Sequence, residues 1–172
     1  LGTNAIVVVN DNDMSIAENH GGLYKHLREL RESNGTCAQN YFRTLGLDYI
    51  YLEEGNDVAK LVEVFQRVKD IDHPIVVHIH TEKGHGFQPA IDNKEQWHWH
   101  FPFNEDGSLR KPRKQREYMP AMLGQWLREE MKQNPKLVCL SAGVPAILGF
   151  DAETRQKVGA QHFDVGIAEE AC

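Results

Sequence analysis

Polar residues that could bind a metal ion follow directly on the first apolar run of the chain. The run 5–9 (AIVVV) ends in the segment 10–14 (NDNDM). Consecutive apolar, mostly β-branched residues are typical of a strand buried on both faces of a parallel sheet, and open α/β sheets bind ligands at the carboxyl ends of such strands. Carboxylate, amide and carbonyl oxygens suit magnesium, which usually also coordinates phosphates. The residue types alone favour the plainer alternative, a turn rich in Asn and Asp.

A second group of residues is suited to binding a phosphate. The segment 81–90 (TEKGHGFQPA) follows another β-branched run, 75–79, and carries Lys83 beside two glycines. Glycines let the backbone approach a ligand closely, and a lysine can neutralise a phosphate charge. Taken alone, a single Gly-x-Gly is weak evidence, and a flexible turn with an exposed lysine is the better interpretation.

Histidines are frequent in and after this segment and raise the question of a zinc site. They are His78, His80, His85, His98 and His100. No cysteine lies near them, and no two of them have the i, i+4 spacing of ligands on one helix face. For His78, His80 and His100 we therefore expect solvated or packed side chains.

A pair of acids near the end of the chain could exchange protons with a ligand. Glu169 and Glu170 follow the short apolar segment 163–165. They would lie in the first turn of a helix, where the helix dipole favours negative charge. That placement explains both acids without any catalysis.

The elements that must position these groups alternate between strands and helices. Apolar runs predict strands at 5–9, 49–52, 75–79, 137–140 and 163–165, and helical periodicity predicts helices at 23–31, 58–71, 122–131 and 151–157. Asp57 is the expected N-cap of the second helix, and Asn34-Gly35 and His73-Pro74 are the expected breaks. No periodicity survives from Thr81 to Arg116, which we expect to be loop and linker. The order predicts an α/β fold with a parallel sheet flanked by helices.

Three of these segments, in this order, resemble one known family. NDNDMSIAENHGGLYKHL is similar to the second half of the thiamine-diphosphate motif as it occurs in the 1-deoxy-D-xylulose-5-phosphate synthase family and its transketolase relatives. TEKGHGFQPA is similar to the Thr-x-Lys-Gly-x-Gly-Tyr-x-Pro-Ala segment of that family, and FDVGIAEE to its Phe-Asp-Val-x-Ile-Ala-Glu-Gln segment. The resemblance covers nearly the whole chain and implies a thiamine-diphosphate-binding fold.

The resemblance implies which residues hold the cofactor diphosphate. Asn12 would give its side-chain oxygen and Met14 its backbone carbonyl to a magnesium ion (Mg2+), which bridges the diphosphate to the protein. Lys83 and Phe87 would lie near the cofactor. Phe87 stands where the family has a tyrosine, so any contact that the tyrosine hydroxyl makes in relatives is missing here.

The resemblance also implies which residues take part in catalysis. Glu169 would hydrogen-bond a pyrimidine nitrogen of thiamine diphosphate. His98, in Trp97–Phe103, matches a family histidine that lies over the reactive face of the cofactor, and histidine suits proton transfer near neutral pH. Two further departures lie beside these residues: Trp99 replaces a small residue, and Glu170 replaces a glutamine.

The implied activity is the condensation of pyruvate with glyceraldehyde 3-phosphate to 1-deoxy-D-xylulose 5-phosphate, with release of carbon dioxide. This product feeds isoprenoid precursor, thiamine and pyridoxal biosynthesis. Two alternatives stay open, transketolase-like ketol transfer between sugar phosphates and a non-catalytic paralogue of the synthase. The resemblance further implies a homodimer for the full-length protein.

The resemblance predicts the domain organisation. Residues 1–103 would be the C-terminal part of the diphosphate-binding domain, 104–118 a linker, and 119–172 the start of the pyrimidine-binding domain. The sequence has no initiator methionine and lacks the Gly-Asp-Gly half of the cofactor motif. We therefore expect an internal fragment, with a fold incomplete at both ends and no turnover by itself.

The amino-acid composition argues against some classes of protein. The 172 residues are 41% hydrophobic and 26% charged, with a formal net charge of −6. This acidic balance argues against a nucleic-acid partner, and the basic run 110–116 contains prolines and no aromatics, as a solvated linker does. No segment reaches the roughly 18 apolar residues of a membrane span. The three scattered cysteines fit a reducing compartment. We expect a cytoplasmic protein that acts on small molecules, without a nucleic-acid or membrane partner.

Overall fold

The computed structural model describes residues 2–106, 108, 110 and 118–171. Most of the predicted linker 104–118 thus lies outside the described residues. The chain forms two compact units, and each is described here by itself. Unit 1 comprises Leu1–Met14 and His20–Ile91, and unit 2 comprises Ser15–Asn19 and Asp92–Cys172. The predicted domain limits at 103 and 119 stay predictions.

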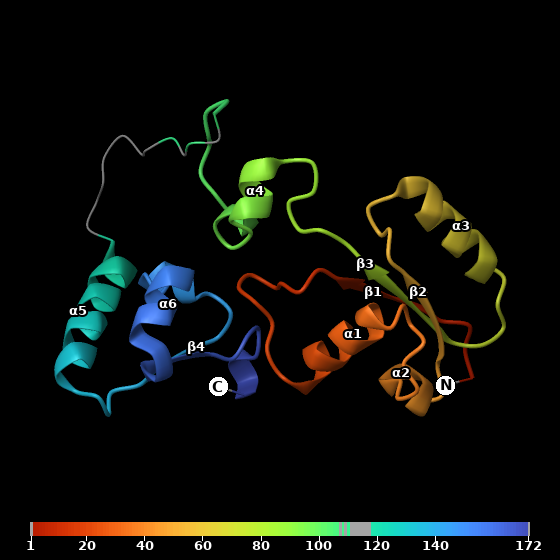
Figure 1. The fold of residues 1–172 in the computed structure, drawn as a ribbon, viewed down its shortest axis with the longest axis horizontal. Coiled ribbons are helices and arrows are strands. Elements are labelled where there is room, and N and C mark those ends of the chain that lie inside the picture. Colours follow the sequence, from red (N-terminus) through yellow and green to blue (C-terminus); the bar gives the residue numbers. More distant parts are fainter. Residues whose placement is uncertain (1, 107, 109, 111–117, 172) are drawn as a thin grey trace. The chain divides into compact units, whose positions relative to one another are not determined.

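Unit 1 contains a three-stranded parallel sheet in the order β1-β3-β2 (Figure 1). The strands are β1 (Ile6–Asp11), β2 (Asp48–Leu52) and β3 (Ile75–His80). In the register, Ile6 lies opposite Ile75 and Asp11 opposite His80, while Leu52 pairs with Ile79. The carboxyl ends of all three strands therefore lie at one edge of the sheet, as the alternating pattern predicted.

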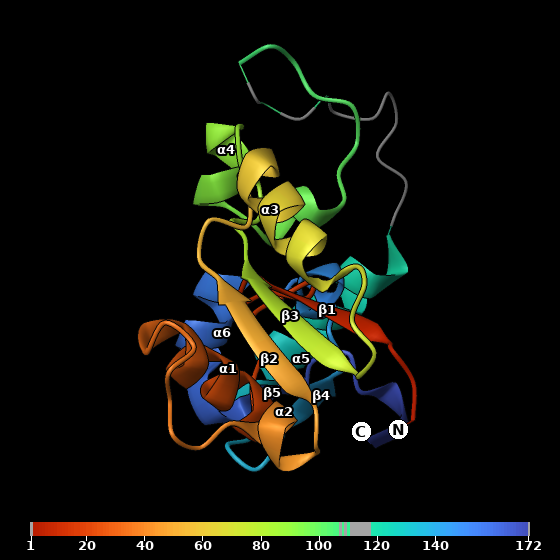
Figure 2. The ribbon, with the colours of Figure 1, turned by 90° about the vertical axis from the view of Figure 1, so that its right-hand side faces the viewer.

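Helices pack on both faces of this sheet (Figure 2). On one face, α3 (Val58–Val68) buries Val64 and Val68 against β2 and β3. On the other face, α1 (Gly22–Glu32) and α2 (Tyr41–Thr44) bury Leu27, Leu30 and Phe42. The Asp57 side chain accepts hydrogen bonds from the amides of Ala59 and Lys60, which confirms the predicted N-cap of α3.

The burial of the first strand differs from the prediction. The middle strand β3 is the one buried on both faces, since all residues from Ile75 to Ile79 are buried. In β1, Val7 and Val8 are each 45% exposed. The reason is position in the sheet, because β1 pairs with β3 along one side and is an edge strand of the described sheet. An apolar run thus identified the strand correctly but not its place in the sheet.

Some helical turns were not predicted. The short helix α2 follows Asn40, whose side chain accepts hydrogen bonds from the amides of Phe42 and Arg43. Within the segment predicted as loop, α4 (Gln88–Asp92) and the 3-10 turn η1 (Gln96–His98) form. Pro89 lies in the first turn of α4, where the missing N–H of proline costs nothing.

Unit 2 contains two parallel strands, β4 (Cys139–Ser141) and β5 (His162–Asp164), in the order predicted. Its helices are α5 (Met119–Gln133) and α6 (Ala152–Val158). The 3-10 turn η2 (Pro145–Leu148) lies between β4 and α6, and η3 (Gly159–Gln161) lies between α6 and β5. The expected helix after β5 is a 3-10 turn, η4 (Glu169–Ala171). Among the described residues, no helix is long and apolar enough to cross a membrane.

Candidate functional site

The predicted metal loop leaves the carboxyl end of β1 as a tight turn. The Asn12 side-chain oxygen Oδ1 accepts a hydrogen bond from the Met14 amide at 3.1 Å, and Asp13 has a left-handed backbone with φ of 62°. Asn12 is half-buried and Asp11, the last residue of β1, is buried. An amide oxygen has two lone pairs, so the hydrogen bond from Met14 leaves Asn12 one acceptor position for a cation.

Both carboxylates of this loop are already bound to one arginine. Arg31, from the last turn of α1, forms ion pairs with Asp11 and, at 2.6 Å, with Asp13. Burial would raise the pKa of Asp11, but hydrogen bonds from His78 and Arg31 outweigh burial and lower it from 3.8 to about 2. The Asp11 carboxylate therefore stays ionised and paired.

His78 links Asp11 to the neighbouring strands of the sheet through hydrogen bonds. Its ring is fully buried, with Nε2 2.9 Å from Asp11 Oδ2 and Nδ1 2.7 Å from the Tyr49 hydroxyl. Burial raises the pKa of Tyr49. His78 is thus a packed histidine, one of the two environments expected for it, and its hydrogen bonds orient Asp11.

The donor set limits how a magnesium ion could bind here. In the described part of the chain, no group of three or more His, Cys, Asp or Glu side chains is arranged to hold a metal. The Asn12 side-chain oxygen and the Met14 carbonyl are hard but neutral donors. Magnesium usually binds through few protein oxygens together with phosphates, so these residues fit part of a site that a diphosphate would complete.

The lysine segment lies at the same edge of the sheet. Thr81 follows β3, and its amide donates to the Asp11 carbonyl at 2.9 Å while its hydroxyl donates to Asn10 Oδ1 at 2.5 Å. Gly84 then turns the chain with φ of 90°. Lys83 and Phe87 are both half-buried. Neighbouring parallel strands thus bring the predicted metal loop and the lysine segment together in unit 1.

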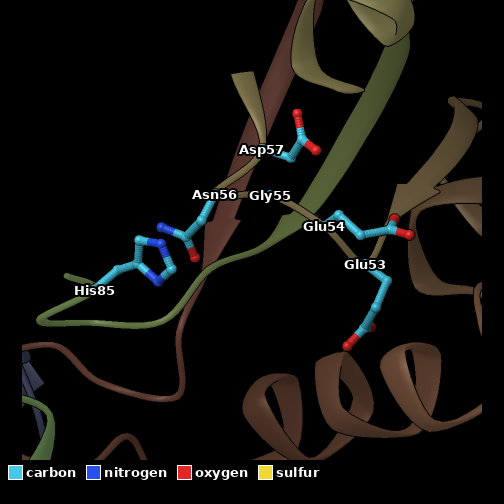
Figure 3. Close-up of a pocket in the computed structure, with 6 residues that line it drawn as sticks. All are labelled: Glu53, Glu54, Gly55, Asn56, Asp57 and His85. Carbon is cyan, nitrogen blue, oxygen red and sulfur yellow. The ribbon is translucent and has the colours of Figure 1, made fainter. Parts of the chain in front are cut away.

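A pocket of about 360 Å³ lies beside this edge, where β2 ends (Figure 3). Three carboxylates and one histidine line it, together with Gly55 and Asn56: Glu53, Glu54, Asp57 and His85. Asn56 Oδ1 accepts a hydrogen bond from the Glu82 amide at 2.8 Å, which ties the pocket rim to the lysine segment. Like charges repel, so this acidic pocket does not suit a diphosphate.

In unit 2, a clamp of charged residues holds the segment that leads to His98. Both Arg155 guanidinium nitrogens Nη1 and Nη2 donate to Glu95, at 3.0 and 2.9 Å, and Nη2 also donates to Glu18 at 3.1 Å. Burial would lower the pKa of Arg155, but the hydrogen bonds that it donates to the Glu95 carboxylate outweigh burial and raise this pKa. His98 itself is exposed at the end of η1, and its amide donates to the Glu95 carbonyl at 3.2 Å.

Asp164 holds the turn that leads to the predicted catalytic glutamate. Its carboxylate accepts hydrogen bonds from the Ser141 hydroxyl at 2.8 Å and from the amides of Gly143 and Gly166 at 3.2 and 2.7 Å. Glu169 lies in η4 and is exposed, as is Glu170. The role of Asp164 was not predicted from the sequence, although an aspartate at a strand end before a Val-Gly pair is typical of such a turn.

The group Ser141, His162 and Asp164 is not a nucleophilic triad. A nucleophilic serine donates its proton to the histidine. Here Ser141 donates its single hydroxyl proton to Asp164, so His162 Nε2, 3.2 Å away, can act on Ser141 as a donor. Burial lowers the pKa of His162, whose ring stacks on Phe150 at 4.6 Å. These three residues stabilise the turn after β5.

The predicted site residues thus fall in two groups. Unit 1 brings Asn12, Met14, Lys83 and Phe87 to one edge of its sheet. Unit 2 carries His98 and Glu169. The roles predicted for all six stay predictions. Arg31 and Arg155, which sequence analysis did not single out, bind the segments on which several of them lie.

The parallel sheet with ligand-suited residues at its carboxyl edge has the α/β, thiamine-diphosphate-binding type of fold expected from the sequence. A family model described as 1-deoxy-D-xylulose-5-phosphate synthase matches residues 1–39 and 32–81. The chain is thus similar to this synthase family, and the resemblance noted in its motifs is confirmed.

Curated relatives extend the similarity along the chain. The 1-deoxy-D-xylulose-5-phosphate synthase of Listeria monocytogenes is 33% identical over 180 residues, which cover 99% of this chain and 29% of that protein. The enzyme of the same name from Clostridium beijerinckii is 29% identical, covering 98% and 32%. The 1-deoxy-D-xylulose-5-phosphate synthase 1 of Geobacter sulfurreducens is 30% identical, covering 99% and 32%. The chain spans about 30% of the length of these relatives.

Proposed function

We propose that this chain forms part of a thiamine-diphosphate-dependent transferase that makes 1-deoxy-D-xylulose 5-phosphate from pyruvate and glyceraldehyde 3-phosphate. The observation that carries the proposal is the shared sheet edge, where Thr81 hydrogen-bonds to both Asn10 and Asp11 and so joins the metal loop to the lysine segment. The names of the relatives give the product, and the resemblance of the motifs implies the substrates and the cofactor. Transketolase-like transfer and a non-catalytic paralogue remain the alternatives.

Five of the six predicted site residues have a proposed task. Asn12 and Met14 would hold a magnesium ion through neutral oxygens, and Lys83 would neutralise a phosphate charge. Glu169 would hold or release a proton at the pyrimidine nitrogen of the cofactor, and His98 would move substrate protons. Thiamine diphosphate, when bound, supplies carbanion stabilisation that no side chain provides.

The proposal separates binding from turnover. For the 172-residue chain by itself we propose binding of the cofactor diphosphate with Mg2+ and no sustained release of carbon dioxide. The activity is that of relatives about three times as long. The homodimer implied by the resemblance and the cytoplasmic location expected from the composition remain predictions.

Substitution of Asn12 tests the proposed metal site. Asn12→Ala removes one metal ligand, so the affinities for thiamine diphosphate and for magnesium should fall together, by roughly tenfold or more. Titration calorimetry of the chain with each ligand in the presence of the other measures both affinities.

The control is Asn134→Ala. Like Asn12, Asn134 accepts one hydrogen bond through its side-chain oxygen from the amide two residues further along the chain, that of Lys136, at 3.0 Å, and it has no proposed ligand role. Its loss should leave both affinities unchanged. Unchanged affinities in Asn12→Ala would show that Asn12 is a turn residue, and a wild-type chain that binds no cofactor at millimolar concentration would contradict the proposed function.

A further inference from the structure

The turn that carries the proposed metal ligands has an unfavourable backbone conformation at its centre. Asp13 has φ of 62°, in the left-handed region. Aspartate enters this region more easily than most residues, but the surrounding structure must still hold it there. Because Asp13 lies between Asn12 and Met14, its backbone sets the directions of the Asn12 side chain and the Met14 carbonyl.

Arg31 is the residue that holds Asp13. Its Nη2 lies 2.6 Å from both carboxylate oxygens of Asp13, while Nη1 pairs with Asp11. The Arg31 side chain is 9% exposed. A planar guanidinium that binds two carboxylates at once fixes their relative position, which a flexible ammonium group cannot do as well.

Arg31 is itself fixed by a buried chain of hydrogen bonds. Asp11 from β1 contacts His78 from β3, and His78 contacts Tyr49 from β2. Burial raises the pKa of Tyr49, so its hydroxyl keeps its proton and can donate to His78 Nδ1, which leaves His78 Nε2–H to donate to Asp11. Residues from all three strands of the sheet thus fix the position of the Arg31 guanidinium group.

From these contacts, and resting on the proposed function, we propose that Arg31 is a positioning residue for the metal loop. By binding Asp11 and Asp13 together, Arg31 keeps Asp13 in the left-handed conformation and so orients the Asn12 oxygen and the Met14 carbonyl toward a cation. It also keeps both carboxylates paired, which leaves these neutral oxygens as the donors of the loop.

The structure offers a matched control on the same helix. Arg28 Nη2 lies 3.8 Å from Asp13 Oδ1, and the Arg28 side chain is 58% exposed. An exposed pair at this distance contributes little. Arg28→Met therefore removes a guanidinium near the same carboxylate without removing the buried link to the sheet.

Two measurements test the proposal. The first is titration of thiamine diphosphate at saturating Mg2+. The second is hydrogen exchange of the Met14 amide in ligand-free protein, which reports the Asn12–Met14 turn directly. Arg31→Met should weaken cofactor binding about tenfold and speed the exchange of this amide about tenfold. Arg28→Met should change each by less than about twofold.

A second substitution separates positioning from general stabilisation. Glycine adopts a positive φ without strain, so Asp13→Gly in the Arg31→Met background should restore most of the amide protection and binding. If Arg31→Met does not fold, Arg31→Lys is used in its place. It should have an intermediate effect on amide exchange and cofactor binding, because lysine keeps the positive charge but lacks the planar guanidinium group that binds both carboxylates.

The outcomes are distinguishable. Unchanged exchange in the folded Arg31 variant, or a loss that Asp13→Gly does not restore, would overturn the positioning role. A wild-type chain that binds no thiamine diphosphate would remove the proposed function, while the exchange of the Met14 amide would still decide whether Arg31 holds the turn.

Discussion

Replacement of Arg155 by methionine should destabilise unit 2 strongly. The Arg155 side chain is 14% exposed and donates two hydrogen bonds to Glu95, which is 11% exposed, and one to the Phe150 carbonyl at 2.9 Å. Methionine keeps much of the aliphatic volume and removes the charge. The Glu95 carboxylate would then be nearly buried without its cationic partner.

The expected magnitude follows from these exposures. Breaking a fully buried ion pair by removing one partner costs about 3–5 kcal/mol. Glu95 retains some contact with water, so we expect Arg155→Met to lower the free energy of unfolding by about 2–3 kcal/mol. The pair of Arg155 with Glu18 involves a carboxylate that is 57% exposed and should contribute less than about 1 kcal/mol.

Urea denaturation of the proteins of two double-mutant cycles, which share the wild-type chain and Arg155→Met, measures these contributions separately. The coupling energy of Arg155 with Glu95, substituted by glutamine, should exceed that of Arg155 with Glu18. Lys157→Met on the same helix is the control, because Lys157 and its partner Glu153 are 70% and 76% exposed. This substitution should lower the midpoint of urea unfolding far less than Arg155→Met does.

Two results would refute this reasoning. Equal coupling of Arg155 to Glu95 and to Glu18 would mean that burial does not decide the strength of the pair. A cost of Arg155→Met no greater than that of Lys157→Met would mean that the clamp contributes nothing to the stability of unit 2.

Two further predictions concern single positions in unit 2. In a full-length protein that contains this chain, Glu169→Gln should reduce turnover of pyruvate and glyceraldehyde 3-phosphate by about 100-fold or more without unfolding the protein. Glu170→Gln should reduce turnover by far less. Equal losses in a carbon dioxide release assay would show that the catalytic glutamate has been assigned to the wrong position. Gly124→Ala should lower the free energy of unfolding by about 2 kcal/mol or more, because a Cβ there would lie 1.6 Å from the Leu148 carbonyl oxygen. Thermal denaturation beside Met122→Ala, at a half-exposed position of the same helix, checks this, and equal melting temperatures of the two variants would contradict it.

Local patterns were sufficient to predict most elements of this fold. The apolar run 75–79 is β3, and the helical spacing of 58–71 corresponds to α3, which begins after the predicted cap Asp57 and ends at Val68. These elements depend on neighbours in the sequence. The burial of β1 could not be predicted in the same way, because exposure of Val7 and Val8 depends on which strand lies beside them.

Long-range partners account for the rest of what sequence analysis missed. Arg31 and Asp13 are 18 residues apart, and Arg155 and Glu95 are 60 residues apart. No periodicity or spacing connects such pairs. The motif identified Asn12 and Glu169 as candidates, but the residues that fix their segments, Arg31 and Asp164, become visible when the chain is folded.

The segment Ser15–Asn19, which belongs to unit 2, has a consequence for synthesis of the protein. Glu18 emerges from the ribosome 137 residues before its partner Arg155. At typical elongation rates this interval is on the order of ten seconds, long enough for unit 1 to form around the gap. Until α6 has been made, the ion pair that holds Glu18 in the finished fold cannot form. The segment between β1 and α1 would therefore be more accessible to chaperones and proteases in the nascent chain than in the finished protein.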